Sequence, residues 1–471
     1  MIKNQAQFNT NELKAIFSES AVIFDEQINC QSVVIDSREV TPNSLFVAIK
    51  GENIDAHTKV EDAYKNGASV CVVNQQWYEE NKTNFQNYNF IVVDDTLKAL
   101  GKLANFHRLR FDLDILAVAG SNGKTTTKEM IAEVLAKKYR ILKTYKNFNN
   151  QIGVPLMLLS LNDDIEIAVL ELGTNYPSEI LILSEMVAPT AGIITNIGKE
   201  HLEGFIDLDG VEAEETTLFA YLKKSDSIAF VNMDDERLKM YAMVLDNKFT
   251  YGTSNEKYYN LNSKIEFDSK FNAKIVLNDQ INEYVLNLKA KGLNFAYNSI
   301  AAFAVGLHYK VPVEDIIDAL SNYTPDNSAQ YARMSIEEYN RLLLLNDTYN
   351  ANPSSTKLAL ESLKLIPEVS LKVAVLGDMR ELGDNSIAEH IDILNYASEL
   401  ADYILLFGEN YKIAKQSVDN EKCQHFNEKL DLFNFLKELI INNSDKLAVL
   451  VKGSRGLKME EIVEMIKKEY K

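Results

Sequence analysis

The residues with the clearest chemical potential form the segment Gly120-Ser-Asn-Gly-Lys-Thr-Thr126. Glycines allow backbone N–H groups to converge on an anion, a lysine adds a fixed positive charge, and a threonine hydroxyl can bind Mg²⁺. The strict P-loop pattern needs a glycine where this chain has Val118, so the segment matches a shorter Gly-Ser/Thr-x-Gly-Lys-Thr-Thr loop. The sequence predicts a nucleotide-phosphate site, and the alternative interpretation is a plain helix cap.

The elements on either side of this loop fit a phosphate site. The apolar run Ile115–Ala119 predicts a buried strand, and a helical pattern begins after the loop. A strand, a glycine turn and a helix start direct free N–H groups and the positive end of the helix dipole at the turn. Four apolar residues share one face of the expected helix: Met130, Ile131, Val134 and Leu135.

Composition limits the classes of function. The chain has 471 residues, of which 46% are hydrophobic and 25% charged, as in ordinary globular proteins, and about three domains of ~150 residues are expected. A net charge of −19 argues against non-specific binding to nucleic acids or anionic membranes. Positive charge for anionic substrates must then be local, and the candidates are Lys124, Arg333, Lys452 and Arg455.

We expect a cytoplasmic protein. The start of the chain, Met1-Ile-Lys-Asn-Gln5, lacks the apolar core of a signal peptide, and no stretch approaches ~20 uninterrupted apolar residues. Three scattered cysteines, Cys30, Cys71 and Cys423, fit reduced thiols that serve only for packing.

The alternation of strand and helix patterns predicts an α/β protein with three domains, over residues 1–108, 109–325 and 326–471. The middle domain should contain a doubly wound parallel sheet with a small antiparallel excursion between Lys257 and Asn287. The turn-forming segment Tyr323–Ser328 is the expected linker, and the last domain should be of Rossmann type. The expected buried strands include Ser32–Asp36, Leu45–Ile49, Ser69–Val73, Ile165–Leu170, Gly192–Asn196, Ile228–Val231, Leu342–Leu345, Val373–Leu376, Tyr403–Phe407 and Leu447–Val451, and the last expected helix is Met459–Tyr470.

Polar residues follow several of these strands in the middle domain. Glu171 ends a buried run, where its carboxylate could bind Mg²⁺ or cap the next helix. His201 follows another strand, after Thr195-Asn196, and is either a structural histidine or a ligand of metal or phosphate. The amides of Asn147–Pro155 suit recognition of a polar substrate, although they could equally form turns.

Three polar segments follow strands of the last domain: Asn346–Pro353, Gly377–Gly383 and Lys452–Arg455, with His390 close to the second in sequence. The third precedes a helix and therefore suits an anionic group at the helix N-terminus. Because carboxyl ends of parallel strands meet at one edge of a sheet, these segments indicate a binding face.

Together these motifs resemble the Mur ligase superfamily of ATP-dependent amide-forming enzymes in peptidoglycan synthesis, over about residues 36–459. Asp36-Ser-Arg38, Leu45-Phe-Val-Ala48 and Asp55-Ala-His57 are similar to the N-terminal UDP-recognition domain of the tripeptide- and dipeptide-adding members. The three polar segments of the last domain are similar to members that join D-alanyl-D-alanine to UDP-N-acetylmuramoyl-tripeptide. A folylpolyglutamate synthase would show His-Asn-Pro in place of Tyr349-Asn-Ala-Asn-Pro353 and would lack the Asp-Ser-Arg region.

The resemblance implies a three-domain Mur ligase architecture with a central P-loop-type sheet, ATP and Mg²⁺ as cofactors, and an acyl-phosphate intermediate. It also implies a cell-wall precursor and a dipeptide as small-molecule substrates, bound by a monomer. For ATP, the resemblance implies phosphate binding by Gly120, Ser121, Asn122, Gly123, Lys124, Thr125 and Thr126, and nucleotide contacts from Asn298, Arg333 and Asp347. It implies one Mg²⁺ on Thr125 and Glu171, and a second that His201 assists. For the substrates, it implies uridine contacts from Ser37 and Arg38, UDP-sugar contacts from Asn149 and Asn150, and further contacts in the last domain, which receives the dipeptide, from Tyr349, Asn350, Asn352, Lys452, Ser454 and Arg455.

The chain departs from the family at two places. Family members usually carry a lysine, converted by CO₂ to a carbamate, about five residues after the glycine that matches Gly210, and this chain has Glu215 there. We hypothesise that Glu215 supplies the same negative charge to Mg²⁺ and is catalytic; the alternative is an exposed helical glutamate. The adenine-side pattern Gly-x-His-Asn-x-x-Asn is also altered, to Gly292-Leu-Asn-Phe-Ala-Tyr-Asn298, which leaves Asn298 as the adenine candidate.

Two other functions stay open at this point. A sibling ligase that adds a single amino acid is the nearest rival. The missing lysine could also mark a catalytically impaired nucleotide-binding homologue, although the presence of Lys124, Glu171 and Asp347 argues against a decayed site.

Overall fold

The computed structural model describes residues 4, 6–24, 27–51, 53–254, 259–325, 333–418 and 420–470. Contacts divide the chain into two compact units. The first contains Met1–Ala117, Tyr139–Thr174 and Ser178–Ala191, and the second contains Val118–Lys138, Asn175–Pro177 and Gly192–Lys471. Strands β8 (Asp114–Ala119) and β11 (Ala191–Ile194) have residues in both units.

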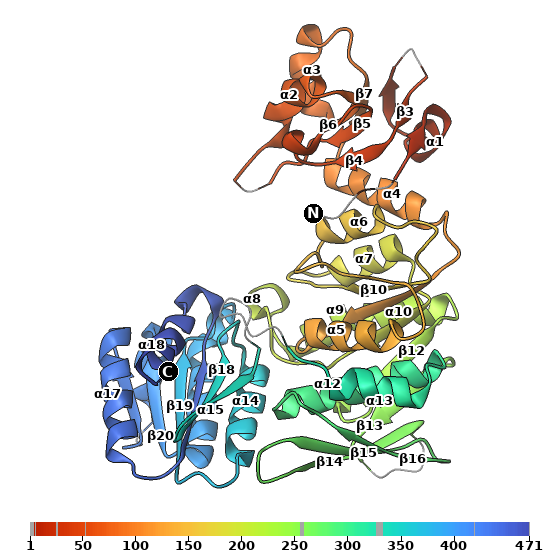
Figure 1. Ribbon diagram of the computed structural model, residues 1–471. Helices are drawn as coiled ribbons and strands as arrows, with labels where there is room; N and C mark the ends of the chain where they lie inside the picture. Colours follow the sequence, from red (N-terminus) through yellow and green to blue (C-terminus); the bar gives the residue numbers. More distant parts are fainter. Residues whose placement is uncertain are drawn as a thin grey trace. The chain divides into compact units, whose positions relative to one another are not determined.

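The first unit begins with a five-stranded sheet in the order β2-β7-β6-β5-β4, in which β4 to β7 run parallel and β2 is antiparallel. Its strands alternate with short helices, because apolar runs rich in valine and phenylalanine separate segments with helical spacing. Helices α2 and α3 lie over this sheet (Figure 1). The bounds are β1 Phe8–Asn9, α1 Thr10–Ile16, β2 Ala21–Ile23, β3 Asn29–Cys30, β4 Ser32–Val34, β5 Ser44–Val47, α2 Val60–Lys65, β6 Ala68–Asn74, α3 Gln75–Asn81, β7 Phe90–Val93 and α4 Thr96–Arg108.

The rest of the first unit contains the parallel pair β9 and β10 and the helices α6 and α7, which pack on α4. Arg108 at the end of α4 is buried and donates to the backbone carbonyls of Val187 and Ala188, at distances of 3.0 and 3.2 Å. These bonds attach the end of α7 to α4. The bounds are β9 Ile141–Lys143, α6 Gly153–Leu158, β10 Ile167–Glu171 and α7 Glu179–Val187.

The second unit begins with the loop after β8 and helix α5, on which α12 and α13 pack. Strands β12, β13 and β14 run parallel, and β14, β15 and β16 form the predicted antiparallel excursion. The bounds are α5 Lys124–Leu135, α8 Leu202–Phe205, α9 Leu208–Glu215, α10 Thr217–Lys224, β12 Ile228–Asn232, α11 Glu236–Tyr241, β13 Lys248–Gly252, β14 Leu261–Phe267, β15 Ala273–Asn278, β16 Glu283–Asn287, α12 Leu293–His308 and α13 Val313–Ser321.

A six-stranded sheet in the order β17-β18-β22-β19-β20-β21 completes the second unit. Helices α17 and α18 cover one face of this sheet and α14 lies on the other side (Figure 1). All strand pairs are parallel except β17–β18. The bounds are β17 Ser335–Tyr339, β18 Leu342–Asp347, α14 Pro353–Leu365, β19 Leu371–Gly377, α15 Ser386–Leu400, β20 Tyr403–Phe407, α16 Glu409–Lys415, β21 Cys423–Phe426, α17 Lys429–Asn442, β22 Leu447–Lys452 and α18 Glu460–Tyr470.

The strands expected from the sequence form, with shifts at their ends. The first expected strand was too long: β4 ends at Val34, because Asp36 accepts from the Arg38 N–H and caps a turn of 3₁₀ helix over Ser37–Glu39. Likewise β11 ends at Ile194, before the polar Thr195 and Asn196. Part of the expected linker, residues 326–328, lies outside the described residues, as does Lys257. The three domain limits stay a prediction.

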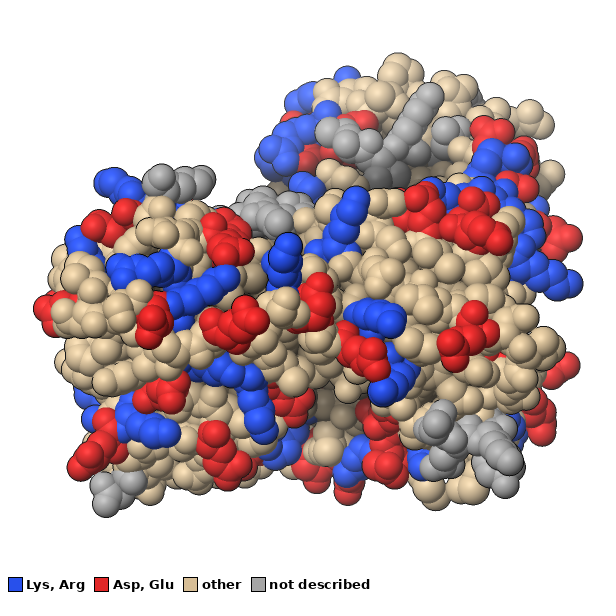
Figure 2. Space-filling view, turned by 60° about the horizontal axis from the view of Figure 1, so that its bottom comes forward, with Lys and Arg blue, Asp and Glu red and all other residues tan. Residues whose placement is uncertain are grey.

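Two further expectations concern cysteines and membranes. Cys30, Cys71 and Cys423 are buried and form no disulfide. Within the described ranges, no helix is both long enough and apolar enough to cross a membrane. Basic and acidic side chains are interspersed over the face shown in Figure 2.

Candidate active site

The loop after β8 turns through two glycines with left-handed backbone. Gly120 has a φ of +110° and Gly123 a φ of +80°, and Gly123 is the N-cap of α5. A Cβ atom on residue 120 would lie 2.4 Å from the Thr195 hydroxyl oxygen, and one on residue 123 would lie 2.8 Å from the Asn298 Oδ1 atom. Because both residues are glycines, the loop backbone can lie close to Thr195, which follows β11, and to Asn298 of α12. A side chain at either position would prevent this approach.

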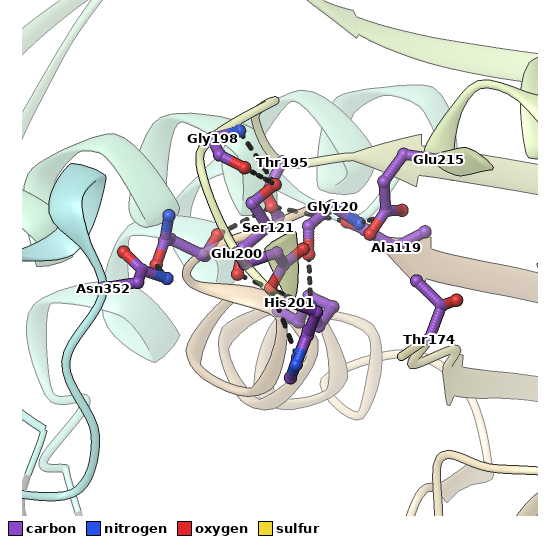
Figure 3. Close-up of polar contacts among 12 residues, drawn as sticks. Ala119, Gly120, Ser121, Thr174, Thr195, Gly198, Glu200, His201, Glu215 and Asn352 are labelled. Carbon is purple, nitrogen blue, oxygen red and sulfur yellow. Dashed lines mark hydrogen bonds and ion pairs between the residues drawn. The ribbon is translucent and has the colours of Figure 1, made fainter. Parts of the chain in front are cut away.

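The segment after β11 fixes the conformation of the loop. The Ser121 N–H donates to the Asn196 carbonyl over 2.9 Å, and the Thr195 hydroxyl donates to the Asn122 carbonyl over 2.7 Å. The Ser121 hydroxyl donates to the Gly198 carbonyl over 3.0 Å (Figure 3). No side chain among the described residues caps α5, so its first turn keeps backbone N–H groups pointing at the loop.

Lys124 is held at the loop by neighbouring acceptors. Its Nζ atom donates to the Gly120 carbonyl over 2.5 Å and lies 3.5 Å from the Glu200 Oε2 atom. The side chains of Lys124 and Glu200 are only 14% and 7% exposed. Burial raises the pKa of Glu200, and the charge of Lys124 opposes that rise. The ammonium group thus balances an acid that the protein has removed from water.

Glu215, at the end of α9, is fully buried and not an exposed helical residue. Its Oε2 atom accepts from the Gly120 N–H over 2.7 Å (Figure 3), while its Oε1 atom is buried and has no hydrogen-bond partner among the described residues. Burial raises the pKa of Glu215 to about 8, with Lys124 opposing the rise and Glu200 adding to it. Glu215 and Glu200 are therefore coupled acids beside one lysine.

His201 is bound to Glu381, which lies in the loop after β19 of the last sheet. It is the N-cap of α8, with a φ of +46°, and its Nδ1 atom lies 2.6 Å from the Glu381 carboxylate. Its Nε2 atom lies 3.9 Å from the Glu200 Oε2 atom. The hydrogen bond from His201 lowers the pKa of Glu381.

The last sheet brings its polar strand ends together, as predicted. The register pairs Asp347 with Lys452 across β18 and β22, and their side chains form an ion pair of 2.6 Å that is 14% and 3% exposed. Lys452 also donates to the Asn350 carbonyl over 2.9 Å, and Asp347 accepts from the Met334 N–H over 3.0 Å. The negative charge of Asp347 is therefore neutralised by Lys452, and its carboxylate is held in place by a backbone N–H as well.

Other predicted residues of this sheet lie around that pair. The Arg333 guanidinium lies 4.1 Å from the centre of the Tyr349 ring, and Arg455 forms an exposed ion pair with Glu460. Ser454 accepts from the Arg380 N–H over 2.8 Å. The side-chain amide of Asn352, which caps α14, donates to the Asn122 Oδ1 atom over 2.9 Å. This hydrogen bond joins the segment after β18 to the loop after β8.

The first unit holds the remaining predicted residues. Glu171, at the end of β10, is buried, accepts from the Asn149 side-chain amide over 2.9 Å and has an Oε2 atom without a partner. The Asn150 side chain accepts from the N–H groups of Ile152 and Gly153, as an asparagine that stabilises a turn does. Ser37 is buried, whereas Arg38 is exposed and bound to Asp36.

Of the predicted residues in the second unit, the structure brings the loop, Asn298, Glu215, His201 and Asn352 to one place, while Thr125 is half-buried in the first turn of α5. Sequence reasoning singled out neither Glu200 nor Glu381, although Glu381 lies in the polar segment Gly377–Gly383. Glu200 directly precedes His201 at a strand end and could have been noticed by that position. No group of three or more His, Cys, Asp or Glu residues in the described part of the chain is arranged to hold a metal ion. The metal assignments to Thr125, Glu171 and His201 stay predictions, as do the substrate contacts.

Comparisons with known proteins agree on one family. Residues 29–108 match the model described as "Mur ligase family, catalytic domain", residues 118–306 "Mur ligase middle domain", and residues 332–455 "Mur ligase, glutamate ligase domain". The UDP-N-acetylmuramoyl-tripeptide–D-alanyl-D-alanine ligase of Bacillus subtilis is 33% identical over 93% of each chain. The enzyme of that name from Haemophilus influenzae is 33% identical over 96% of this chain and 97% of its own.

Solved structures show the same relationship. A crystal structure of MurF from Acinetobacter baumannii superposes with a TM-score of 0.86 at 29% identity, covering 99% of this chain and all of that one. MurF ligase from Thermotoga maritima, solved in complex with ADP, gives a TM-score of 0.79 at 25% identity over 93% of this chain and 97% of its own. The predicted α/β class and three-domain architecture are confirmed. On both sequence and fold, this chain belongs to the Mur ligase family.

Proposed function

We propose that this chain is an ATP-dependent ligase that joins D-alanyl-D-alanine to UDP-N-acetylmuramoyl-tripeptide, with release of ADP and phosphate, in peptidoglycan precursor synthesis. The observation that carries this proposal is the similarity to ligases of that name along nearly the whole chain, in relatives from different bacteria. The loop around Lys124 supports it, because glycines, a half-buried lysine and an open helix N-terminus suit a triphosphate.

The proposed reaction has two chemical steps. An oxygen of the tripeptide carboxylate attacks the γ-phosphorus of ATP, the bond to the β-phosphate oxygen breaks, and ADP leaves. The dipeptide amine then attacks the acyl carbon, loses a proton, and expels inorganic phosphate. Lys124 counteracts the charge that develops on the transferred phosphoryl group, and orientation of the reactants supplies much of the remaining acceleration.

Lys124 would change partners when a triphosphate binds. In this structure its ammonium contacts the Gly120 carbonyl and Glu200. A phosphate oxygen offers a more negative acceptor than a carbonyl, and the ammonium carries three donors that can turn toward it.

The second unit offers two buried carboxylates to a magnesium ion. Glu200 and Glu215 each have a buried carboxylate oxygen that has no hydrogen-bond partner among the described residues, and Mg²⁺ prefers oxygen ligands of this kind. The Thr125 hydroxyl would be one ligand of an ion, and His201 with Glu215 would hold another, while Glu171 keeps the metal role that the resemblance to the family implies. When bound, the ion would neutralise charge on the phosphates.

We assign the remaining roles by the same proposal. Residues 1–108 would recognise the UDP end, with Ser37 and Arg38 at the uridine, and residues 109–325 would bind ATP, with Asn298 near the adenine. Residues 326–471 would receive the dipeptide, and Asp347 and Arg333 would reach the nucleotide. The enzyme would act as a cytoplasmic monomer on small-molecule substrates.

The test is an ADP-release assay with purified UDP-tripeptide and either D-alanyl-D-alanine or single amino acids, including diamino acids. The proposal requires release that depends on Mg²⁺, on the tripeptide and on the dipeptide. Turnover with a single amino acid alone would identify a sibling ligase. ATP binding without turnover across the panel would identify an impaired nucleotide-binding protein.

A further inference from the structure

His201 lies between two carboxylates that come from different parts of the second unit. Its Nδ1 atom is 2.6 Å from the Glu381 carboxylate, and its Nε2 atom is 3.9 Å from the Glu200 Oε2 atom. The same Glu200 oxygen is 3.5 Å from the Lys124 Nζ atom. The two ring nitrogens of His201 therefore have different surroundings. Nδ1 is bound to Glu381, and Nε2 is directed toward Glu200, which contacts Lys124.

Glu381 comes from the loop after β19, far along the chain from His201. Its backbone carbonyl accepts from the Glu203 N–H over 3.3 Å, so the contact involves the backbone as well as the side chain. Neighbouring contacts join residues 198–203 to two helices of the same sheet: Lys199 forms an ion pair of 2.5 Å with Glu389 of α15, and its N–H donates to the Ser354 hydroxyl of α14 over 3.1 Å.

Both residues of the pair have a backbone that side chains disfavour. His201 has a φ of +46° and Glu381 a φ of +62°. Non-glycine residues keep such conformations where surrounding contacts determine them, and they gather at functional sites. The Glu381 side chain is 52% exposed and that of His201 24%, so the two left-handed conformations, and not burial of the ion pair, distinguish this contact from an ordinary surface ion pair.

We propose that Glu381 is a positioning residue for His201, whose ring it fixes in the Nδ1–H tautomer with Nε2 directed toward Glu200 and Lys124. A histidine that donates one ring N–H to a carboxylate presents its other nitrogen as a lone pair of known direction. Under the proposed function, on which this inference rests, that nitrogen faces the cation and phosphoryl group held at the loop.

Through Glu381, the last sheet affects the orientation of a residue at the loop after β8. Glu381 follows β19, so the His201 ring is oriented only while this part of the chain lies against residues 198–203. Glu381 itself need not contact substrate.

The first experiment reads the tautomer directly. Long-range ¹H–¹⁵N spectra of the full chain distinguish the two ring nitrogens, and a His201→Gln variant identifies the signal among the six histidines. We expect the Nδ1–H form in the wild type and in Glu381→Gln, whose amide oxygen can still accept. Glu381→Ala should give the Nε2–H form or a mixture. An unchanged His201 spectrum in Glu381→Ala would overturn the proposal.

The second experiment measures turnover. Loss of such an orienting partner typically costs about 10- to 100-fold, so kcat of Glu381→Ala should fall by that factor with a smaller change in KM for ATP. Glu381→Gln should restore most of the loss. Asp384→Asn, an exposed acid three residues away, is the matched control and should retain wild-type kcat. Equal kcat in wild type, Glu381→Ala and Glu381→Gln would contradict the proposal, as would an equal loss in Asp384→Asn.

Melting temperatures of all variants show whether a loss of activity is only unfolding. Alanine keeps the same backbone preference as glutamate at φ +62°, and Glu381→Ser provides a second truncation if Glu381→Ala does not fold. If the wild type lacks ligase activity while its His201 tautomer responds to Glu381→Ala, the proposed function fails and the positioning role stands.

Discussion

The Glu215 carboxylate accepts a hydrogen bond of 2.7 Å from the backbone N–H of Gly120, so the end of α9 is tied to the first residue of the loop after β8. The second oxygen of this carboxylate is buried, and no described residue forms a hydrogen bond with it. A buried acid with one oxygen satisfied and one unsatisfied is poised to bind a proton or a cation. This position corresponds to the one where we expected a substitute for the family's carbamylated lysine.

Glu215→Gln should abolish ligase activity, with a fall in kcat of at least about 100-fold if the negative charge binds Mg²⁺. The glutamine oxygen can still accept from Gly120, so the change removes charge and keeps the hydrogen bond. Added bicarbonate should not change the activity of the wild type, because no lysine needs to be carbamylated. ADP release measures both. Glu214→Gln, the neighbouring acid, should stay active, and near wild-type turnover of Glu215→Gln would discard the idea.

Stability of the protein without ligands should depend on pH through the same residue. The pKa of Glu215 is raised to about 8 in the folded state from an ordinary value of 4.5, so between these values the folded state binds more protons than the unfolded state. Stability must then fall as pH rises from about 4.5 to 8. Relative to the wild type, Glu215→Gln should gain stability over this window, by the order of a few kcal/mol. Urea unfolding at pH 5 and pH 8 tests this, and a gain at pH 5 that exceeds the gain at pH 8 would contradict the sign.

Lys124 and Glu200 should show strong coupling. Lys124→Met leaves a buried acid without its cation and should destabilise the protein by about 3 kcal/mol at neutral pH. Adding Glu200→Gln should restore part of that stability, because Glu200 then carries no charge and Glu215 is the acid that still lacks the lysine. Activity should stay at background in both variants, since the phosphates lose their lysine. Denaturant unfolding combined with ADP release separates the two effects, and purely additive stabilities would argue against the ion pair.

The buried pair of Asp347 and Lys452 offers a comparison between a buried and an exposed ion pair. Lys452→Met should cost about 3–5 kcal/mol, because it strands Asp347 in a site that is 14% exposed. Lys446→Met breaks the exposed pair with Glu338 in the same sheet and should cost less than about 1 kcal/mol. Thermal and urea unfolding of both variants provide the measurement. Equal costs would show that the Asp347 pair is not desolvated as the structure indicates.

Gly120→Ala should disturb the loop. The new Cβ atom would lie 2.4 Å from the Thr195 hydroxyl oxygen, at a φ of +110° that alanine disfavours. We expect a loss of about 1–3 kcal/mol in stability and a weaker affinity for ATP. Gly51→Ala, where the Cβ atom would meet only the Ile54 carbonyl at 3.5 Å, is the matched control. Nucleotide titration calorimetry and unfolding curves check both, and equal ATP affinity in the two variants would refute the close approach.

The sequence by itself determined the elements and the chemistry of their ends. Apolar runs specified β8, β18 and β22, since a buried strand needs uninterrupted hydrophobic residues, and Gly120 and Gly123 marked the loop because side chains cannot occupy those positions. Strand boundaries were less certain: Asp36 capped a turn where the pattern suggested a strand, because local hydrogen bonds compete with the ladder.

Only the tertiary structure decided which charged residues face one another. Glu215 is 95 residues from Gly120, and no periodicity links them, since their contact depends on where the fold places the end of α9. The same holds for His201 and Glu381, which two separate loops bring together. The pKa of Glu215 is also a property of the fold, because it depends on burial and on Lys124 and Glu200 around it.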